Sequence, residues 1–220
     1  MSLAARLVSI PVVAVIVLLG VWVAGGVVSN DFRLSMLLTA VWFAISGLAC
    51  LAIAIRRRSL RVPVLAAYVV SAGAVGLYLG LATLRDRVVD ETVVMAAPAA
   101  VDTSASQPMP ANVEVARGAF RSGEHHTEGR AAVVRVRDRG RFLTLTSFDT
   151  SAGPDLRVRL VPGRSRDGGA DGAIDLGALK GNRGDQQYRL PAGARVAGAT
   201  VVIWCRAFSV DFGSARLGAV

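Results

Sequence analysis

The sequence is poor in the residues that build metal centres and disulfide frameworks. It has two histidines and two cysteines among 220 residues, and aromatic residues make up 6%. Multi-cysteine zinc sites and disulfide scaffolds are therefore excluded, and no Cys-x-x-Cys-His haem attachment sequence occurs. Lys180 is the only lysine, so arginine carries nearly all the positive charge. This bias, with abundant Ala, Val and Gly, is typical of GC-rich coding sequences and predicts a bacterial source.

A basic stripe of the kind that binds nucleic acid is also missing. The net charge is +9, but acidic residues are interleaved with the arginines instead of leaving one element basic. Nucleic-acid surfaces usually combine a basic stripe with stacking aromatics or a groove-reading helix. We therefore expect no nucleic-acid partner.

Asp, Glu, Lys, Arg and His are absent from three long apolar runs, Leu7–Val28, Leu34–Ile55 and Val62–Leu84. Each run is long enough to cross ~30 Å of hydrocarbon at about 1.5 Å per residue. A cleaved signal peptide is the alternative for the first run, but its apolar part exceeds a usual h-region and another apolar run follows at once. We expect three transmembrane helices, at about 7–28, 34–55 and 62–84, within a membrane region 1–91, so that the lipid bilayer is one partner.

The arginines predict how these helices are oriented. Arg56, Arg57, Arg58 and Arg61 crowd the second connection and Arg6 precedes the first helix, whereas the first connection is neutral. The positive-inside rule then places the N-terminus in the cytoplasm and everything after the third helix outside. This predicts a multi-pass cell-membrane protein with an extracytoplasmic C-terminal domain. Because the runs hold no Asp, Glu, Lys, Arg or His, we expect them to anchor the chain rather than to form an ion or proton pathway.

Two further regions follow the apolar runs. Residues 92–112 are mainly Ala, Pro, Ser and Thr, which predicts a flexible linker. Residues 113–220 alternate short β-type runs with Gly, Asp and Pro turns, which predicts an all-β domain, a β-sandwich or a barrel-like fold. Alternation places Phe142 and Phe148 on one strand face, opposite Leu143. The clearest strands are Ala131–Val136, Phe142–Phe148, Leu156–Val161 and Val201–Phe208.

Motifs along this domain carry a resemblance to a known family. In chain order they are Gly118-Ala119-Phe120 with His125, His126 and Gly129; Phe148-Asp149; Gly153-Pro154-Asp155-Leu156; Leu176-Gly177 to Gly181-Asn182; Tyr188 to Pro191; and Val202-Ile203-Trp204-Cys205 with Phe212-Gly213. The series resembles the DM-thirteen domain, also called the electron-transfer DM domain, over essentially all of 113–220. The resemblance implies electron transfer through a characteristic cysteine, which maps onto Cys205, and a membrane or periplasmic redox partner. In some animal relatives the domain accompanies cytochrome-b-type membrane domains, but the helices here lack histidine and cannot hold a bis-histidine haem.

The chemistry of Cys205 can also be considered without the resemblance. The other cysteine, Cys50, lies in the second apolar run, and a disulfide needs Cα atoms within ~7 Å, so the two cannot be bridged. A single thiol persists in an oxidising compartment when it is buried, bound to metal or used as a reactive thiolate. Val201 and Ile203 share its strand face, which favours a core position. A redox or metal role, and pairing with another molecule, stay open.

His125 and His126 are the remaining candidate ligands. Adjacent residues on a strand point to opposite faces, so both could bind one metal only from a loop. Gly123 and Gly129 flank them, as a loop would require. Copper suits imidazole with thiolate, which makes His125, His126 and Cys205 the candidate metal set. No third donor type is evident, the alternative is a pair of turn histidines, and the cofactor, copper or haem, stays open.

These observations favour a membrane-anchored extracytoplasmic domain with a redox role through Cys205. The alternative is a non-enzymatic interaction or structural module at the cell surface. Enzymatic activity is not favoured, because no nucleophile elbow and no glycine-rich nucleotide loop occur.

Overall fold

The computed structural model describes residues 3–28, 32–96 and 112–220. They form two compact units. One comprises the N-terminal helices up to Leu84, and the other begins at Arg85 and contains the strands of the described residues.

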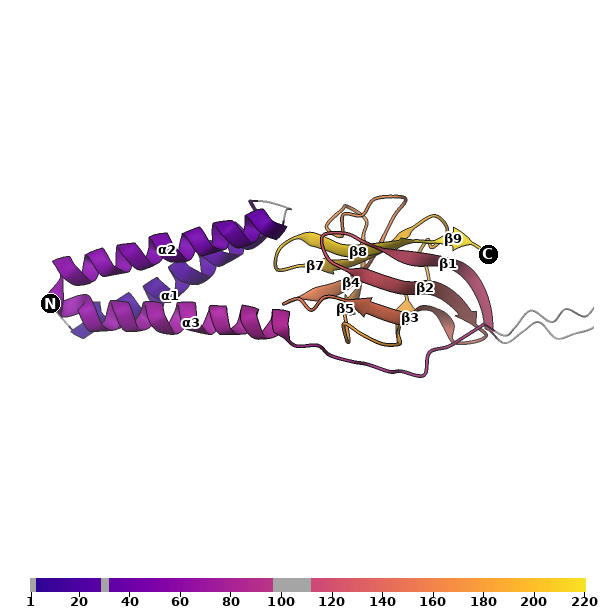
Figure 1. Ribbon diagram of the computed structural model, residues 1–220, viewed down its shortest axis with the longest axis horizontal. Coiled ribbons are helices and arrows are strands. Elements are labelled where there is room, and N and C mark those ends of the chain that lie inside the picture. Colours follow the sequence, from indigo (N-terminus) through magenta and orange to yellow (C-terminus); the bar gives the residue numbers. More distant parts are fainter. Residues whose placement is uncertain (1–2, 29–31, 97–111) are drawn as a thin grey trace, which may run out of the picture. The chain divides into compact units, whose positions relative to one another are not determined.

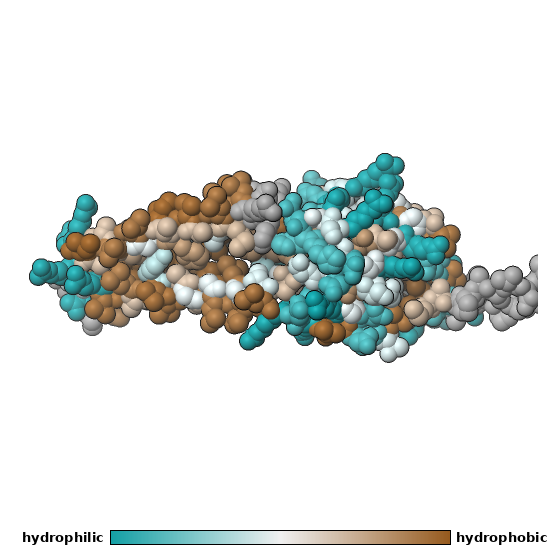
Figure 2. Space-filling view, viewed as in Figure 1, coloured by the Kyte–Doolittle hydropathy of each residue, from teal (hydrophilic) through white to brown (hydrophobic). Residues whose placement is uncertain are grey.

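The helical unit contains three long apolar helices. Their bounds, with a short 3-10 turn between the second and third, are α1 Leu3–Gly26, α2 Phe32–Arg56, η1 Arg58–Leu60 and α3 Arg61–Leu84. All three are long and apolar enough to cross a membrane, and apolar side chains cover the face of this unit seen in Figure 2. The predicted helices are thereby confirmed, whereas residues 29–31 of the first connection lie outside the described residues.

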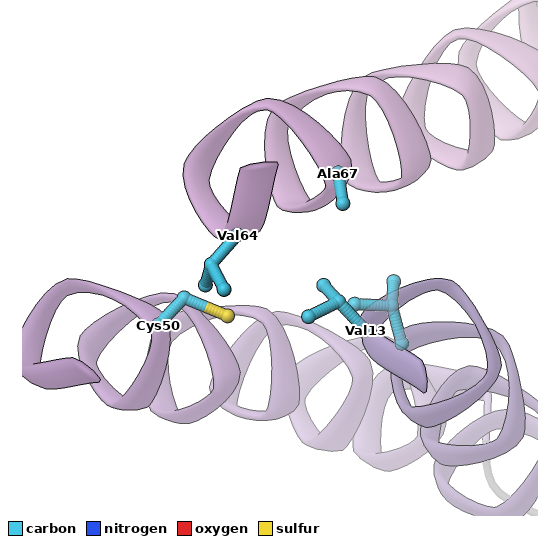
Figure 3. Packing of buried hydrophobic residues seen from close by; sticks show 5 residues of the cluster. Val13, Cys50, Val64 and Ala67 are labelled. Carbon is cyan, nitrogen blue, oxygen red and sulfur yellow. The ribbon is translucent and has the colours of Figure 1, made fainter. Parts of the chain in front are cut away.

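Small and apolar side chains hold the three helices together. Cys50 of α2 packs with Val13 of α1 and Val64 of α3 in one buried cluster (Figure 3). Where α3 meets α2, the Tyr68 hydroxyl donates a 2.6 Å hydrogen bond to the Phe43 carbonyl. This bond gives the hydroxyl of an otherwise apolar helix face a protein partner, as a membrane-spanning helix would require.

The β unit is a nearly closed antiparallel barrel (Figure 1). Among the described residues its strand order is β5-β4-β7-β8-β1-β2-β3-β6, with β9 paired to β1. This confirms the all-β prediction and selects the barrel-like alternative. The strand bounds are β1 Asn112–Ser122, β2 Thr127–Val136, β3 Gly140–Thr150, β4 Leu156–Val161, β5 Ile174–Ala178, β6 Gln186–Leu190, β7 Thr200–Cys205, β8 Val210–Arg216 and β9 Gly218–Ala219.

A β-bulge between β2 and β3 changes which side chains face the core. The pairing register shifts beside Gly129, which has φ 112°, and Ser147 on the facing strand has φ 48°. One extra residue reverses the alternation beyond it. Phe148 is therefore buried, with its ring centroid 5.1 Å from that of Phe120, while Phe142 stays half-buried. The prediction that Phe142 and Phe148 share a face is wrong for this reason.

Strand β7 is shorter than predicted. It ends at Cys205, and Arg206–Ser209 forms the turn into β8, with Ser209 at φ 51°. A positive φ at a serine interrupts extended backbone. The predicted strand Val201–Phe208 is thus three residues too long at its C-terminal end.

The segment Arg85–Met95, here called the strap, belongs to the β unit. Its Val89 amide donates to the Arg183 carbonyl at 2.9 Å, and its Val94 amide donates to Gln187 Oε1 at 3.0 Å. Beyond the strap, residues 97–111 of the expected linker lie outside the described residues.

Candidate functional site

Cys205 lies inside the barrel at the C-terminal end of β7. It is opposite Leu156 of β4 and Val210 of β8, and it is 0% exposed, as is Ile203 on the same strand face. It forms no disulfide with Cys50. Cys205 therefore lies in the core, as the alternation of side chains along its strand favoured.

Trp204 points to the other face of β7. It packs with Val161 and Val202 in a separate small cluster. The guanidinium of Arg159 lies 5.3 Å from the centroid of its ring, which is cation–π geometry. A Cβ on Gly168 would overlap the indole, so glycine at that position lets the 162–173 loop cover it. Adjacent residues of β7 thus lie in two distinct apolar environments.

The histidines occupy the connection between β1 and β2, as expected of a loop. The ring centroid of His125 lies 4.0 Å from that of Phe212 in β8. Burial lowers the pKa of His125, an effect that the nearby Glu124 carboxylate opposes. His126 is exposed, with Nε2 4.0 Å from Glu128 Oε1. The two side chains therefore have different surroundings.

Strand register brings the histidine loop and Cys205 to the same end of the barrel. Ser122, at the end of β1, pairs with Gly213 of β8, and Gly213 also pairs with Ile203 of β7. The loop begins directly after Ser122, and Cys205 lies two residues beyond Ile203. No sequence pattern showed this proximity, because the strands involved are far apart in the chain.

The residues at this end do not fit a three-ligand metal centre as they stand. Within residues 3–28, 32–96 and 112–220, no three His, Cys, Asp or Glu side chains gather where they could hold a metal ion. His126 is exposed beside Glu128, whereas Cys205 is completely buried. The set His125, His126 and Cys205 is thus not assembled, and copper or haem would need a further donor or a rearranged loop.

Two buried threonines at the same end were missed by sequence reasoning. The hydroxyls of Thr127 in β2 and Thr150 in β3 lie 2.7 Å apart. The Thr127 hydroxyl is also 3.1 Å from the Phe212 carbonyl, and the Thr150 hydroxyl donates to the His126 carbonyl at 3.0 Å. A Cβ on Gly213 would overlap Thr127, so glycine there gives the hydroxyl its place. Threonine is an ordinary strand residue, so only the register of the barrel reveals this network.

A second polar cluster joins the strap to the barrel. Lys180 Nζ lies 2.7 Å from Glu91 Oε1 and donates to the Gln187 carbonyl at 2.8 Å. Burial raises the pKa of Glu91, but hydrogen bonds from Lys180 and the Gln187 amide outweigh it and leave the pKa below its ordinary value. Burial also raises the pKa of Tyr188, whose hydroxyl is 2.8 Å from Gln186 Oε1. Lys180, the sole lysine of the chain, therefore links the strap to the barrel.

The chain thus combines three apolar helices long enough to cross a membrane with a β-barrel that encloses a cysteine. Residues 119–217 of the barrel match the family model described as Electron transfer DM13. The match runs from β1 to just beyond β8 and leaves the helices out. No curated protein and no solved structure matches the chain. The DM13 domain suggests an electron-transfer-related role, in agreement with the resemblance.

Proposed function

We propose that the chain is a membrane-anchored protein whose barrel takes part in electron transfer outside the cytoplasm, with Cys205 as the redox group. The observation that carries this proposal is the DM13 match over 119–217, because Cys205 is the only cysteine within the matched residues. Its redox partner would be a membrane or periplasmic protein. Helices α1, α2 and α3 would anchor the chain in the cell membrane.

Burial of Cys205 restricts the chemistry. A mixed disulfide with a partner needs an accessible thiolate, so it would require this end of the barrel to open. One-electron exchange does not need contact, because electrons cross short stretches of packed protein. A thiol that gives up an electron also releases its proton. His125, whose pKa is lowered by burial, is neutral at pH 7 and is the group we propose to accept that proton, directly or through water.

The orientation rests on charge. Arg56, Arg57, Arg58 and Arg61 flank the connection between α2 and α3, and arginine clusters resist translocation. With the N-terminus and this connection in the cytoplasm, the barrel is extracytoplasmic. A membrane-impermeant protease added to cells whose outer envelope has been removed, so that only the cytoplasmic membrane remains, should digest the chain beyond α3. Protection of the barrel until the cells are lysed would reverse the orientation.

A second candidate is an interaction or structural module without redox chemistry. The observation that favours it is the complete burial of Cys205, because a buried cysteine can serve as a small hydrophobe. No ligand cluster in the described residues calls for a metal. In this case the barrel would act through its surface.

One experiment separates the two. The full Cys50→Ala chain in neutral detergent is examined by spectroelectrochemistry with soluble mediators, beside the Cys50→Ala/Cys205→Ala chain. The redox proposal expects a reversible one-electron wave in the first chain that is absent from the second. Identical traces, together with a Cys205 that reacts with maleimide only in denaturant, would establish the interaction module instead.

A further inference from the structure

The barrel end remote from Cys205 holds a cavity of about 1010 Å³, here called the arginine cavity. It lies where β2 turns into β3 and where β6 ends. Arg135, Arg137, Arg141 and Arg189 line it, and Asp138 is the acidic residue of that lining. Four guanidinium groups and one carboxylate leave a strong local excess of positive charge.

Register arranges part of this lining as one cross-strand row. Val113 of β1 pairs with Arg135 of β2, Arg135 pairs with Arg141 of β3, and Arg141 pairs with Leu190 of β6. Paired residues of neighbouring strands point to the same face of a sheet. Two arginines therefore stand side by side between two aliphatic residues.

This row continues the core face of β2 and β3 to the rim of the barrel, where Arg135 is exposed and Arg141 is half-buried. Val133 and Leu143, two positions along β2 and β3 from the arginines, share their face and are completely buried. Arg135 and Arg141 therefore lie at the outer ends of the strand faces whose inner residues, Val133 and Leu143, belong to the core. The cavity has a basic rim above an apolar floor.

Placing Arg135 opposite Arg141 is unfavourable for the unliganded protein, because like charges directly across a sheet repel. In the described parts of the chain neither residue makes an ion pair, nor does Arg189. By contrast, Arg157 in β4 lies 2.9 Å from the Asp175 carboxylate. Arg141 is nevertheless held in place, since its Nη2 donates to the Ala192 carbonyl at 2.8 Å.

We propose that the arginine cavity binds a phosphate group that carries an apolar substituent. Guanidinium groups bind phosphate through paired, charge-assisted hydrogen bonds, and a multiply charged anion would remove the repulsion between Arg135 and Arg141. Val113 and Leu190 offer the apolar substituent a surface beside the anion. The concave, partly apolar lining favours such a small ligand over an acidic protein segment. The site is separate from Cys205 and does not depend on the redox proposal.

The test is calorimetric titration of the full chain in a neutral maltoside detergent. The probes are dihexanoyl phosphatidic acid, phenyl phosphate and inorganic phosphate. The R135Q/R141Q variant is compared with R121Q/R164Q, which removes the same charge from exposed arginines that make no ion pair in the parts described. We expect R135Q/R141Q to bind the two organic phosphates at least about tenfold more weakly, and R121Q/R164Q to bind them as the unmodified chain does.

The outcomes discriminate among ligands. Preference for the lipid supports a headgroup as the source, whereas equal binding of phenyl phosphate supports a soluble ester. The proposal would be overturned if inorganic phosphate bound as tightly as the two organic phosphates. It would also be overturned if R135Q/R141Q and R121Q/R164Q lost the same amount of affinity for the organic phosphates. So would capture of polyglutamate without capture of either ester. The thermal midpoint of R135Q/R141Q without ligand should equal or exceed that of the unmodified chain, which shows that lost binding is not lost folding.

Discussion

The hydroxyl oxygens of Thr127 and Thr150 lie 2.7 Å apart, at the end of the barrel that also holds Cys205. Both threonines are buried, and each hydroxyl also bonds a carbonyl of a neighbouring segment. A polar pair in this position joins β2, β3 and β8, because a buried hydroxyl must keep its partners. The pair therefore holds the framework around the candidate site.

Replacing Thr150 by valine should test that role. Thr150→Val keeps the shape but removes its bonds to Thr127 and to the His126 carbonyl, so we expect a loss of about 1–2 kcal/mol in the free energy of unfolding. Urea unfolding can be followed by the fluorescence of Trp204, the one tryptophan of the β unit, in a Trp22→Phe/Trp42→Phe background. Thr146→Val, on the same strand and half-buried, is the control and should change little. If Thr150→Val and Thr146→Val lowered the free energy of unfolding equally, the Thr127–Thr150 pair would have no special structural role.

Gly213 should tolerate no side chain. A Cβ there would overlap Thr127, so Gly213→Ala should lower stability by about 1–3 kcal/mol through overpacking. At Gly193 an added Cβ meets no atom within 4 Å, so Gly193→Ala is the matched control and should be nearly neutral. Thermal unfolding of both variants provides the comparison. A stable Gly213→Ala protein would show that Thr127 can move.

The strap should loosen in acid. Because the folded pKa of Glu91 is lowered, its bond to Lys180 contributes stability that is complete above the unfolded pKa, about 4.3, and is lost as the pH falls through the folded value. The protection factors of the Val89 and Glu91 amides, which correct for the pH dependence of intrinsic exchange, should therefore fall below about pH 4. Glu91→Gln should exchange quickly already at neutral pH. Asp90→Asn, at a neighbouring exposed position, should behave as the unmodified chain, and acceleration in that variant would contradict the assignment.

His125 should make the barrel sensitive to mild acid. Burial against Phe212 lowers its folded pKa, so the neutral ring is stabilising above the unfolded pKa, about 6.5, and protonation below that value opposes folding. The thermal midpoint should consequently fall between pH 7.5 and pH 5. His125→Phe should flatten this dependence, whereas His126→Asn, at the exposed position, should preserve it. An unchanged slope in His125→Phe would assign the effect to another group.

Sequence reasoning reached the three helices and the four strands β2, β3, β4 and β7 because these depend on local patterns. Runs such as Val62–Leu84 have no Asp, Glu, Lys, Arg or His, and burying such a residue in lipid is costly. Alternation around Leu143 and around Ile203 gave the core faces correctly. It failed at Phe148, because a bulge between β2 and β3 reverses the pattern without leaving a clear signal in the residues.

By itself, the sequence determined that three apolar segments precede a β-rich domain and that Cys205 has no partner cysteine within reach. Hydrophobic burial and alternation act over a few residues, so these features are readable along the chain. Only the tertiary structure decided that the histidine loop shares one barrel end with Cys205, that Glu91 meets Lys180, and that Arg135 stands opposite Arg141. Those relationships depend on strand register and barrel closure, which bring together residues from separate segments of the chain.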